Sequence, residues 1–74
     1  MQGNLAFEPG SLEREITIRG LSYEAFAKRA GIDPATVSRA IRGDRLKPKS
    51  FGKILIALGQ IPVIEGPVEL VRAS

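Results

Sequence analysis

Two short amphipathic stretches meet at Gly31, and this pairing constrains the fold more than any other feature of the chain. In residues 23–30, one helical stripe carries the apolar side chains Phe26, Ala27 and Ala30. In residues 34–42, the buried side of a second helix is predicted to consist of Val37, Ala40 and Ile41. A small Ala27 lets the second helix cross closely, and a glycine allows the sharp turn between them. The spacing therefore predicts a helix-turn-helix unit.

Local signals mark the ends of both helices. Ser22 is a good N-cap for the first, and Gly31 ends it. Asp33 followed by Pro34 predicts the start of the second, because a carboxylate can cap free amides and proline fits the first turn. Gly43 ends that helix. The unit is therefore expected to span about residues 22–42.

Two further helices are expected around this unit. The first runs from about Gly10 to Arg19 and ends at Gly20, with Leu12 and Ile16 on one face and Glu13, Arg14, Glu15 and Arg19 around the rest. The other starts at Pro48 and ends at Gly59, and its apolar residues recur at helical spacing: Phe51, Ile54, Leu55 and Leu58. The fold class is therefore mainly all-α, a compact four-helix domain.

The two ends of the chain lack a helical pattern. Residues 1–9 are expected to form an N-terminal arm or short extended segment, and residues 10–59 the four-helix domain. In residues 60–74, Pro62, Gly66 and Pro67 break any helix, and the branched apolar residues favour extended or β structure. This C-terminal tail is expected to dimerise or to cover the core.

Composition excludes several classes of site. The chain has no cysteine and no histidine, so it lacks thiolate nucleophiles, disulfides and the usual zinc ligands, and we expect neither a metal nor a cofactor. No carboxylate pair stands in an apolar setting, so an enzyme is not expected. The longest apolar stretch, residues 54–59, is far shorter than the ~20 residues of a membrane span, and no signal sequence is recognisable at the start. These features favour a cytoplasmic protein.

Positive charge is concentrated in one third of the chain. Residues 28–53 contain eight basic and two acidic residues, a net charge of +6, whereas the remainder sums to −3. A folded chain of this kind presents a positive side, which suits a polyanion approached from one direction. Solvated surface charge is the alternative explanation.

The segment GLSYEAFAKRAGIDPATVSRAIRGDRLKP resembles the phage repressor and Cro family of helix-turn-helix proteins, also called XRE-like. The resemblance covers about residues 10–59 and rests on a shared pattern: Gly20-Leu21-Ser22, Ala27, Gly31, Val37, Arg42-Gly43 and Pro48. It implies a lambda-repressor-like fold and a DNA-binding transcription regulator. Tyr23 and Ala25 depart from the Gln and Glu that the family often has there, and no fifth helix is evident in the tail.

With its apolar side turned inward, the third helix exposes a short polar and basic strip. We expect base contacts from five residues, the last of these at the edge of the strip: Ala35, Ser38, Arg39, Arg42 and Thr36. Arginine can bind guanine O6 and N7 in bidentate fashion, serine can donate or accept, and alanine can touch a thymine methyl. An ordinary solvated helix face is the alternative.

Residues that flank the third helix are assigned to phosphates, where the DNA backbone would pass: Tyr23, Lys28, Arg45, Lys47 and Lys49. Tyr23 has an equally supported alternative as a partly buried packing residue with its hydroxyl at the surface. Plain surface charge is expected for three others: Arg14, Arg29 and Lys53.

The leading hypothesis is a sequence-specific, double-stranded DNA-binding repressor or Cro-like regulator that binds a two-fold site as a homodimer, associated with the nucleoid of a bacterial or phage-infected cell. The alternative is an antitoxin or anti-repressor whose tail, residues 60–74, or first helix binds a protein partner. The tail's apolar residues motivate it: Ile61, Val63, Ile64, Val68, Leu70 and Val71. RNA binding lacks an aromatic stacking platform, since two of the four aromatic residues are expected in the core.

Overall fold

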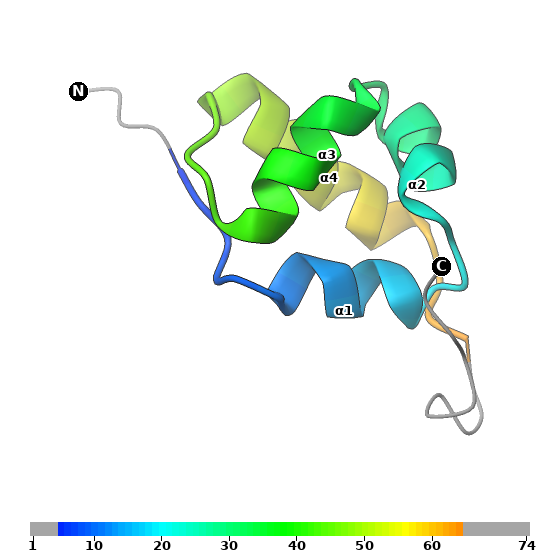
Figure 1. The fold of residues 1–74 in the computed structure, drawn as a ribbon. Helices are drawn as coiled ribbons and strands as arrows, with labels where there is room; N and C mark the ends of the chain where they lie inside the picture. The colour runs from blue at the N-terminus through cyan, green and yellow to red at the C-terminus, as the bar shows by residue number, and fades with distance from the viewer. Residues whose placement is uncertain (1–4, 65–74) are drawn as a thin grey trace.

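A computed structural model of the chain describes residues 5–64, and in this range the architecture is helical. Four helices follow one another: α1 (Ser11–Thr17), α2 (Tyr23–Ala30), α3 (Pro34–Arg42) and α4 (Pro48–Gln60) (Figure 1). β pairing within the described residues is limited to one isolated antiparallel bridge between Leu5 and Leu46. The expectation of a mainly all-α, four-helix domain is therefore confirmed.

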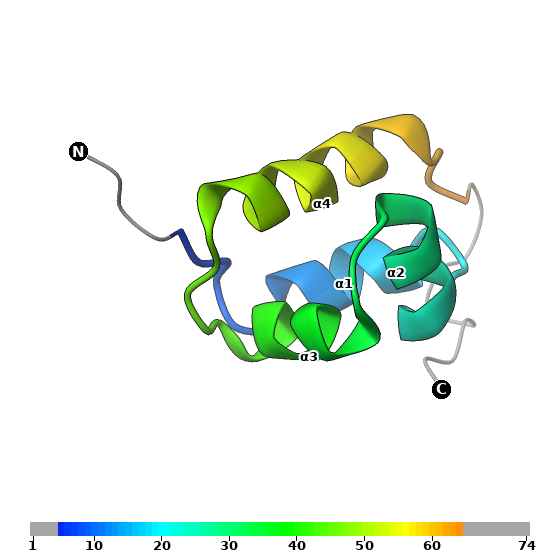
Figure 2. The same cartoon turned by 90° about the horizontal axis from the view of Figure 1, so that it is seen from above.

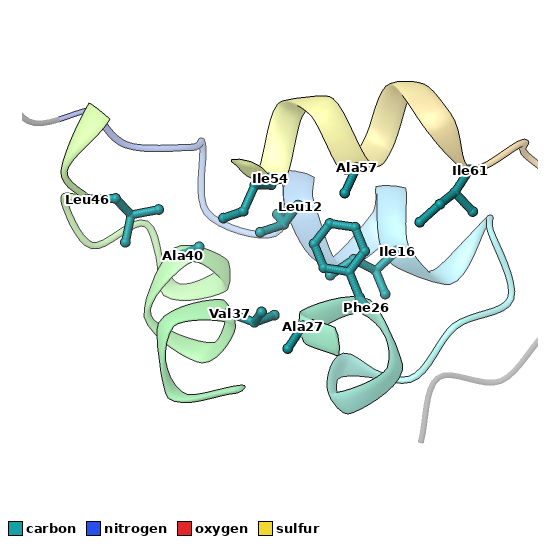
Figure 3. Packing of buried hydrophobic residues seen from close by; sticks show 10 residues of the cluster. All are labelled: Leu12, Ile16, Phe26, Ala27, Val37, Ala40, Leu46, Ile54, Ala57 and Ile61. Atoms are coloured by element: carbon teal, nitrogen blue, oxygen red, sulfur yellow. The ribbon is translucent and has the colours of Figure 1, made fainter. Parts of the chain in front are cut away.

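The helices surround a single core. α2 packs against both α3 and α4, and α1 packs against α3. In the view of Figure 2, α3 and α4 lie on opposite sides of the molecule. Each of the four helices contributes to the core, together with Leu46 from the α3–α4 loop; its buried members are Leu12, Ile16, Phe26, Ala27, Val37, Ala40, Leu46, Ile54, Ala57 and Ile61 (Figure 3).

The ends of α2 and α3 fall where their local signals predicted. The Ser22 hydroxyl accepts a hydrogen bond from the Ala25 amide at 3.1 Å, as an N-cap does. The expectation for Asp33 is only half confirmed. Asp33 is the N-cap residue of α3 and Pro34 opens the helix, but the carboxylate makes no capping hydrogen bond. The amide of Thr36, which such a cap can bind, donates instead to the backbone carbonyl of Asp33 at 2.9 Å.

The outer helices differ slightly from expectation. α1 is shorter than residues 10–19, because Gly10 is its N-cap residue and the regular helix ends at Thr17. α4 continues one residue past Gly59. Leu55 belongs to the predicted set of apolar residues at helical spacing but is 49% exposed, whereas Ile54 is fully buried. Adjacent residues on a helix differ in direction by about 100°, and the buried positions Ala57 and Ile61 centre the inward face of α4 on Ile54, which turns Leu55 toward solvent.

The part of the C-terminal tail that the structure describes, residues 60–64, starts at the core. Ile61 is buried at the end of α4. The Ile64 amide then donates to the Ile18 carbonyl at 2.8 Å, which ties the chain to the end of α1. Val63 and Ile64 are 43% and 44% exposed. The predicted extended or β structure of residues 65–74, with Val68, Leu70 and Val71, lies outside the described residues.

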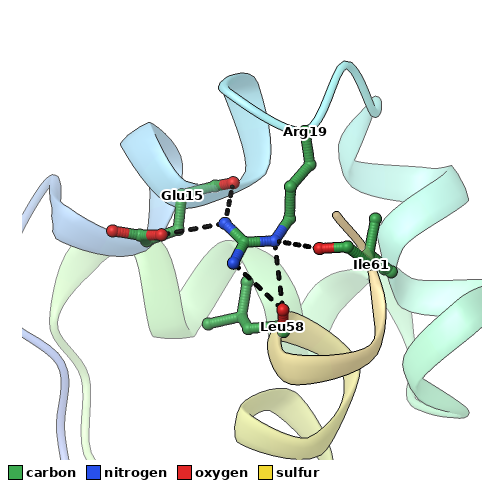
Figure 4. A network of polar contacts seen from close by, with 4 residues as sticks. All are labelled: Glu15, Arg19, Leu58 and Ile61. Atoms are coloured by element: carbon green, nitrogen blue, oxygen red, sulfur yellow. Dashed lines mark hydrogen bonds and ion pairs between the residues drawn. The ribbon is translucent and has the colours of Figure 1, made fainter. Parts of the chain in front are cut away.

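A largely buried arginine joins the ends of α1 and α4 (Figure 4). Its side chain is only 10% exposed, which corrects the sequence-based placement of Arg19 on the polar outside of the first helix. Arg19 Nε donates to the carbonyl oxygens of Leu58 and Ile61 at 3.2 and 2.9 Å, and Nη2 donates to that of Leu58 at 3.0 Å. Nη1 reaches the Glu15 carbonyl and carboxylate, both at 2.8 Å. The guanidinium thus binds carbonyls that the two helix ends leave unpaired.

Candidate nucleic-acid interface

The turn between α2 and α3 sets the orientation of the candidate site. Gly31 has a φ of 76°, a left-handed conformation that glycine adopts without strain, and its amide bonds to the Ala27 carbonyl at 2.9 Å. The Ile32 amide reaches the same carbonyl at 3.0 Å. In Figure 3, Ala27 of α2 and Val37 of α3 point toward each other across the angle between the helices. The buried pair fixes which side of α3 faces outward.

The outward side of α3 carries the predicted strip. Four residues of the strip are exposed: Ala35, Ser38, Arg39 and Arg42. Thr36, at its edge, is half-buried. Val37 and Ala40, on the opposite side, are fully buried. Side chains three and four residues apart share a helical face, so Ala35, Ser38, Arg39 and Arg42 form one continuous surface.

Among residues 5–64, the partners of the two arginines of the strip are weakly held. Arg39 Nη2 lies 3.4 Å from Thr36 Oγ1, and Arg42 Nη2 pairs with Asp44 Oδ2 at 2.9 Å. The Arg42 and Asp44 side chains are 61% and 46% exposed. Exposed ion pairs contribute at most about 1 kcal/mol. A ligand with well-placed acceptors can therefore displace both contacts at small cost.

All four of the predicted flanking cations are exposed, and they lie on three different elements. Lys28 is on α2, Arg45 and Lys47 are on the loop between α3 and α4, and Lys49 is in the first turn of α4. Lys53, expected to be plain surface charge, is also exposed, and its ammonium lies 3.5 Å from the Gly31 carbonyl at the end of α2. Positive charge thus borders the strip on both sides along the chain.

Tyr23 is placed differently from these cations. Its ring is half-buried and packs against the core. Partial burial raises the pKa of its phenol, and a hydrogen bond and the negative charge of the nearby Glu13 carboxylate raise it further. A phosphate would be repelled by that carboxylate. The position therefore favours the packing interpretation of Tyr23 over the phosphate contact.

Acidic side chains suited to metal binding do not gather anywhere in residues 5–64: no group of three or more could hold an ion. Among the described residues, no helix has the length and apolar character needed to cross a membrane. Sequence reasoning missed the contribution of residues 5–10, which bond through the backbone to Ile41 of α3 and Leu46 of the α3–α4 loop and pack on α4 through Phe7. An apolar Phe7 in an otherwise patternless segment was the available signal.

One face of α3 packs against α2, and the opposite face exposes two arginines with further cations on either side. This arrangement is typical of a helix-turn-helix protein that binds DNA. A family model described as "Helix-turn-helix" matches residues 12–65, which is most of the chain. The chain therefore belongs to the helix-turn-helix family of XRE-like proteins, and it is a DNA-binding regulator of that class. No curated protein and no solved structure shows significant similarity to it.

Proposed function

We propose that this protein is a sequence-specific, double-stranded DNA-binding transcription regulator of the repressor or Cro type, with α3 lying in the major groove. One observation supports the proposal most strongly. Arg39 and Arg42 project from the solvent side of a helix whose opposite side, Val37 and Ala40, is fully buried. A helix with that arrangement can present arginines to base edges without disturbing the core.

Within the groove, each residue of the strip has a chemical role. Arg39 and Arg42 donate in pairs to guanine O6 and N7, and Ser38 bonds to a neighbouring base. Ala35 contacts a thymine methyl, while Thr36 lies at the edge of the strip. Arg42 exchanges its carboxylate partner Asp44 for a base, which costs little because that pair is exposed.

Phosphates are bound by the cations that flank α3: Lys28, Arg45, Lys47 and Lys49. These contacts set the register of the protein on the duplex and give affinity that falls with salt. Tyr23 is left out of this set because Glu13 lies beside its hydroxyl.

A domain centred on residues 10–59 covers about one half-site, so the protein acts as a homodimer on a two-fold site. Half-site centres about 10 base pairs apart would place both α3 helices on one face of the DNA. This role places the protein in the cytoplasm, bound to the nucleoid.

Selection of bound duplexes from a random pool, at a stated salt concentration, tests the proposal. An enriched two-fold sequence is expected. Arg39→Ala should then weaken binding to that sequence by about 1 to 3 kcal/mol and relax one base preference, whereas Lys47→Ala should weaken specific and random DNA alike. Arg14→Ala is the matched control, because it removes an exposed arginine from α1. Equal losses on both kinds of DNA for Arg39→Ala would refute the base-reading role.

An antitoxin or anti-repressor role is the alternative, favoured by the exposed apolar side chains of Val63 and Ile64 at the end of the described chain. In that case a protein partner binds the tail, and DNA binding serves autoregulation. Truncation after Ile64 keeps the buried Ile61 and removes the remaining tail. Loss of a captured foreign protein on truncation would support this role, and capture of the protein's own copies alone would count against it.

A further inference from the structure

Residues 5–10, here called the N-terminal strap, are bonded to both ends of the connection between α3 and α4 (Figure 1). The Leu5 amide donates to the Leu46 carbonyl at 2.9 Å, and the Leu46 amide donates to the Leu5 carbonyl at 2.7 Å. At the other end, the Gly10 amide donates to the Ile41 carbonyl at 3.3 Å. The strap therefore spans the connection from the last turn of α3 to Leu46, two residues before α4 begins.

Side-chain contacts hold the strap in this position. Phe7 stacks on Phe51 of α4 with ring centroids 4.4 Å apart and ring planes inclined by 21°. Next to it, Gly43 ends α3 with a φ of 88° and lies so close that a Cβ there would come within 3.0 Å of Pro9 Cγ and 3.3 Å of the Phe7 carbonyl oxygen. The strap is thus seated on the first residue of the loop and on the first turns of α4.

Leu46, the residue that the strap pairs with, lies between two cations of the loop, Arg45 and Lys47. Leu46 is only 3% exposed, and its side chain joins the core. In extended backbone, successive side chains alternate between opposite sides. With Leu46 turned inward and paired to Leu5, its neighbours Arg45 and Lys47 must turn outward, and both are exposed.

We propose that the N-terminal strap is a positioning element for DNA binding: its bridge to Leu46 and its packing on Phe51 hold Arg45 and Lys47 in the orientation that meets phosphates. The inference rests on the proposed function, since it assigns those two cations to the DNA backbone. A released loop would sample several conformations and would have to lose that freedom on binding.

Two substitutions at Leu5 separate the backbone bridge from its side chain. Leu5→Pro removes the amide that donates to Leu46, whereas Leu5→Ala keeps the bridge and removes a side chain that is already 44% exposed. Binding of each variant to the selected duplex is measured over a range of salt concentrations. For Leu5→Pro we expect weaker binding, and a slope of log K against log salt reduced by about 1 to 2, as for the loss of one or two phosphate contacts. Leu5→Ala should behave as the unchanged protein does.

A second pair tests the packing of the strap on α4. Phe7→Ala removes the ring that stacks on Phe51, whereas Phe7→Tyr keeps it. We expect Phe7→Ala to resemble Leu5→Pro, and Phe7→Tyr to resemble the unchanged protein.

A double substitution distinguishes positioning from general destabilisation. In a background of Arg45→Ala and Lys47→Ala, Leu5→Pro should cause no further loss of affinity, because the groups it positions are gone. An equal loss in both backgrounds would overturn the proposal. It would also fail if Leu5→Pro binds as Leu5→Ala does although hydrogen exchange shows that the Leu46 amide has lost its protection.

Failure of the proposed function has a different signature from failure of the strap. If the unchanged protein selects no duplex, the function and the strap's role in it are both refuted. If the protein binds DNA but Arg45→Ala and Lys47→Ala leave the salt slope unchanged, then DNA binding stands and the positioning role alone is overturned.

Discussion

Replacement of Arg19 by alanine should be among the most destabilising single changes in this protein. The guanidinium donates to the carbonyls of Leu58 and Ile61 at the end of α4 and to the carbonyl and carboxylate of Glu15 in α1. Arg19→Ala removes all of these bonds together. It also leaves carbonyl oxygens at two helix ends without their protein partner, in a region that the arginine itself shields from water.

The size of the loss can be estimated from these contacts. Hydrogen bonds to charged groups contribute about 1.5 to 3 kcal/mol each, but water can reach part of the freed helix ends and recover some of this. The Glu15 carboxylate is 43% exposed, so its ion pair adds at most about 1 kcal/mol. We therefore expect Arg19→Ala to reduce the free energy of unfolding by about 2 to 4 kcal/mol. A chain of this length has roughly 4 to 11 kcal/mol in total.

Urea unfolding followed by helical circular dichroism measures this loss, with two variants for comparison. Arg14→Ala removes the same charge from an exposed position of α1 and should change the free energy of unfolding by less than about 0.5 kcal/mol. Arg19→Lys keeps the charge but cannot reach several carbonyls at once, so an intermediate loss is expected. If Arg14→Ala and Arg19→Ala cost the same, the hydrogen bonds at position 19 contribute nothing, and the reasoning is refuted.

Two further predictions concern the core and Tyr23. Ile54→Ala should cost about 2 to 5 kcal/mol of unfolding free energy, because Ile54 is fully buried, whereas Leu55→Ala next to it should cost far less; similar losses in urea unfolding would show that the phase of α4 is wrong. The folded state raises the Tyr23 pKa and so favours the neutral phenol, which contributes stability that is present below the unfolded pKa of about 10 and is lost as the pH rises through the folded pKa. Unfolding measured between about pH 8 and 11 should therefore show a steeper loss for the unchanged protein than for Tyr23→Phe, and parallel curves would contradict this.

The central pair of helices could be predicted because its signals are local. Ser22 and Gly31 bound α2, and Pro34 and Gly43 bound α3, at the residues where the structure places them. Each signal acts through the conformation of its own residue or of the turn beside it. The inward face of α3 followed from periodicity alone, since Val37 and Ala40 are its clearest apolar positions.

Where two local arrangements fitted the sequence equally well, the sequence alone could not predict which one the structure adopts. Ile54 and Leu55 are adjacent and both apolar, so either could have faced the core, and the choice depends on where α4 meets α2. Asp33 has the chemistry of a cap, yet the Thr36 amide bonds to its backbone carbonyl and not to its carboxylate. Such choices are made by packing across the molecule, which no local pattern contains.

The contacts that sequence reasoning missed share one property: their partners are backbone groups far along the chain. Arg19 binds carbonyls 39 and 42 residues away, and Leu5 pairs with Leu46 through amides and carbonyls that every residue possesses. No side-chain pattern marks such an acceptor. The exposed strip of α3 could be predicted because its residues are those left over once the buried side of the helix is assigned. The orientation of the loop cations, in contrast, depends on the strap. The experiment on Leu5 therefore tests the part of the site that only the structure could supply.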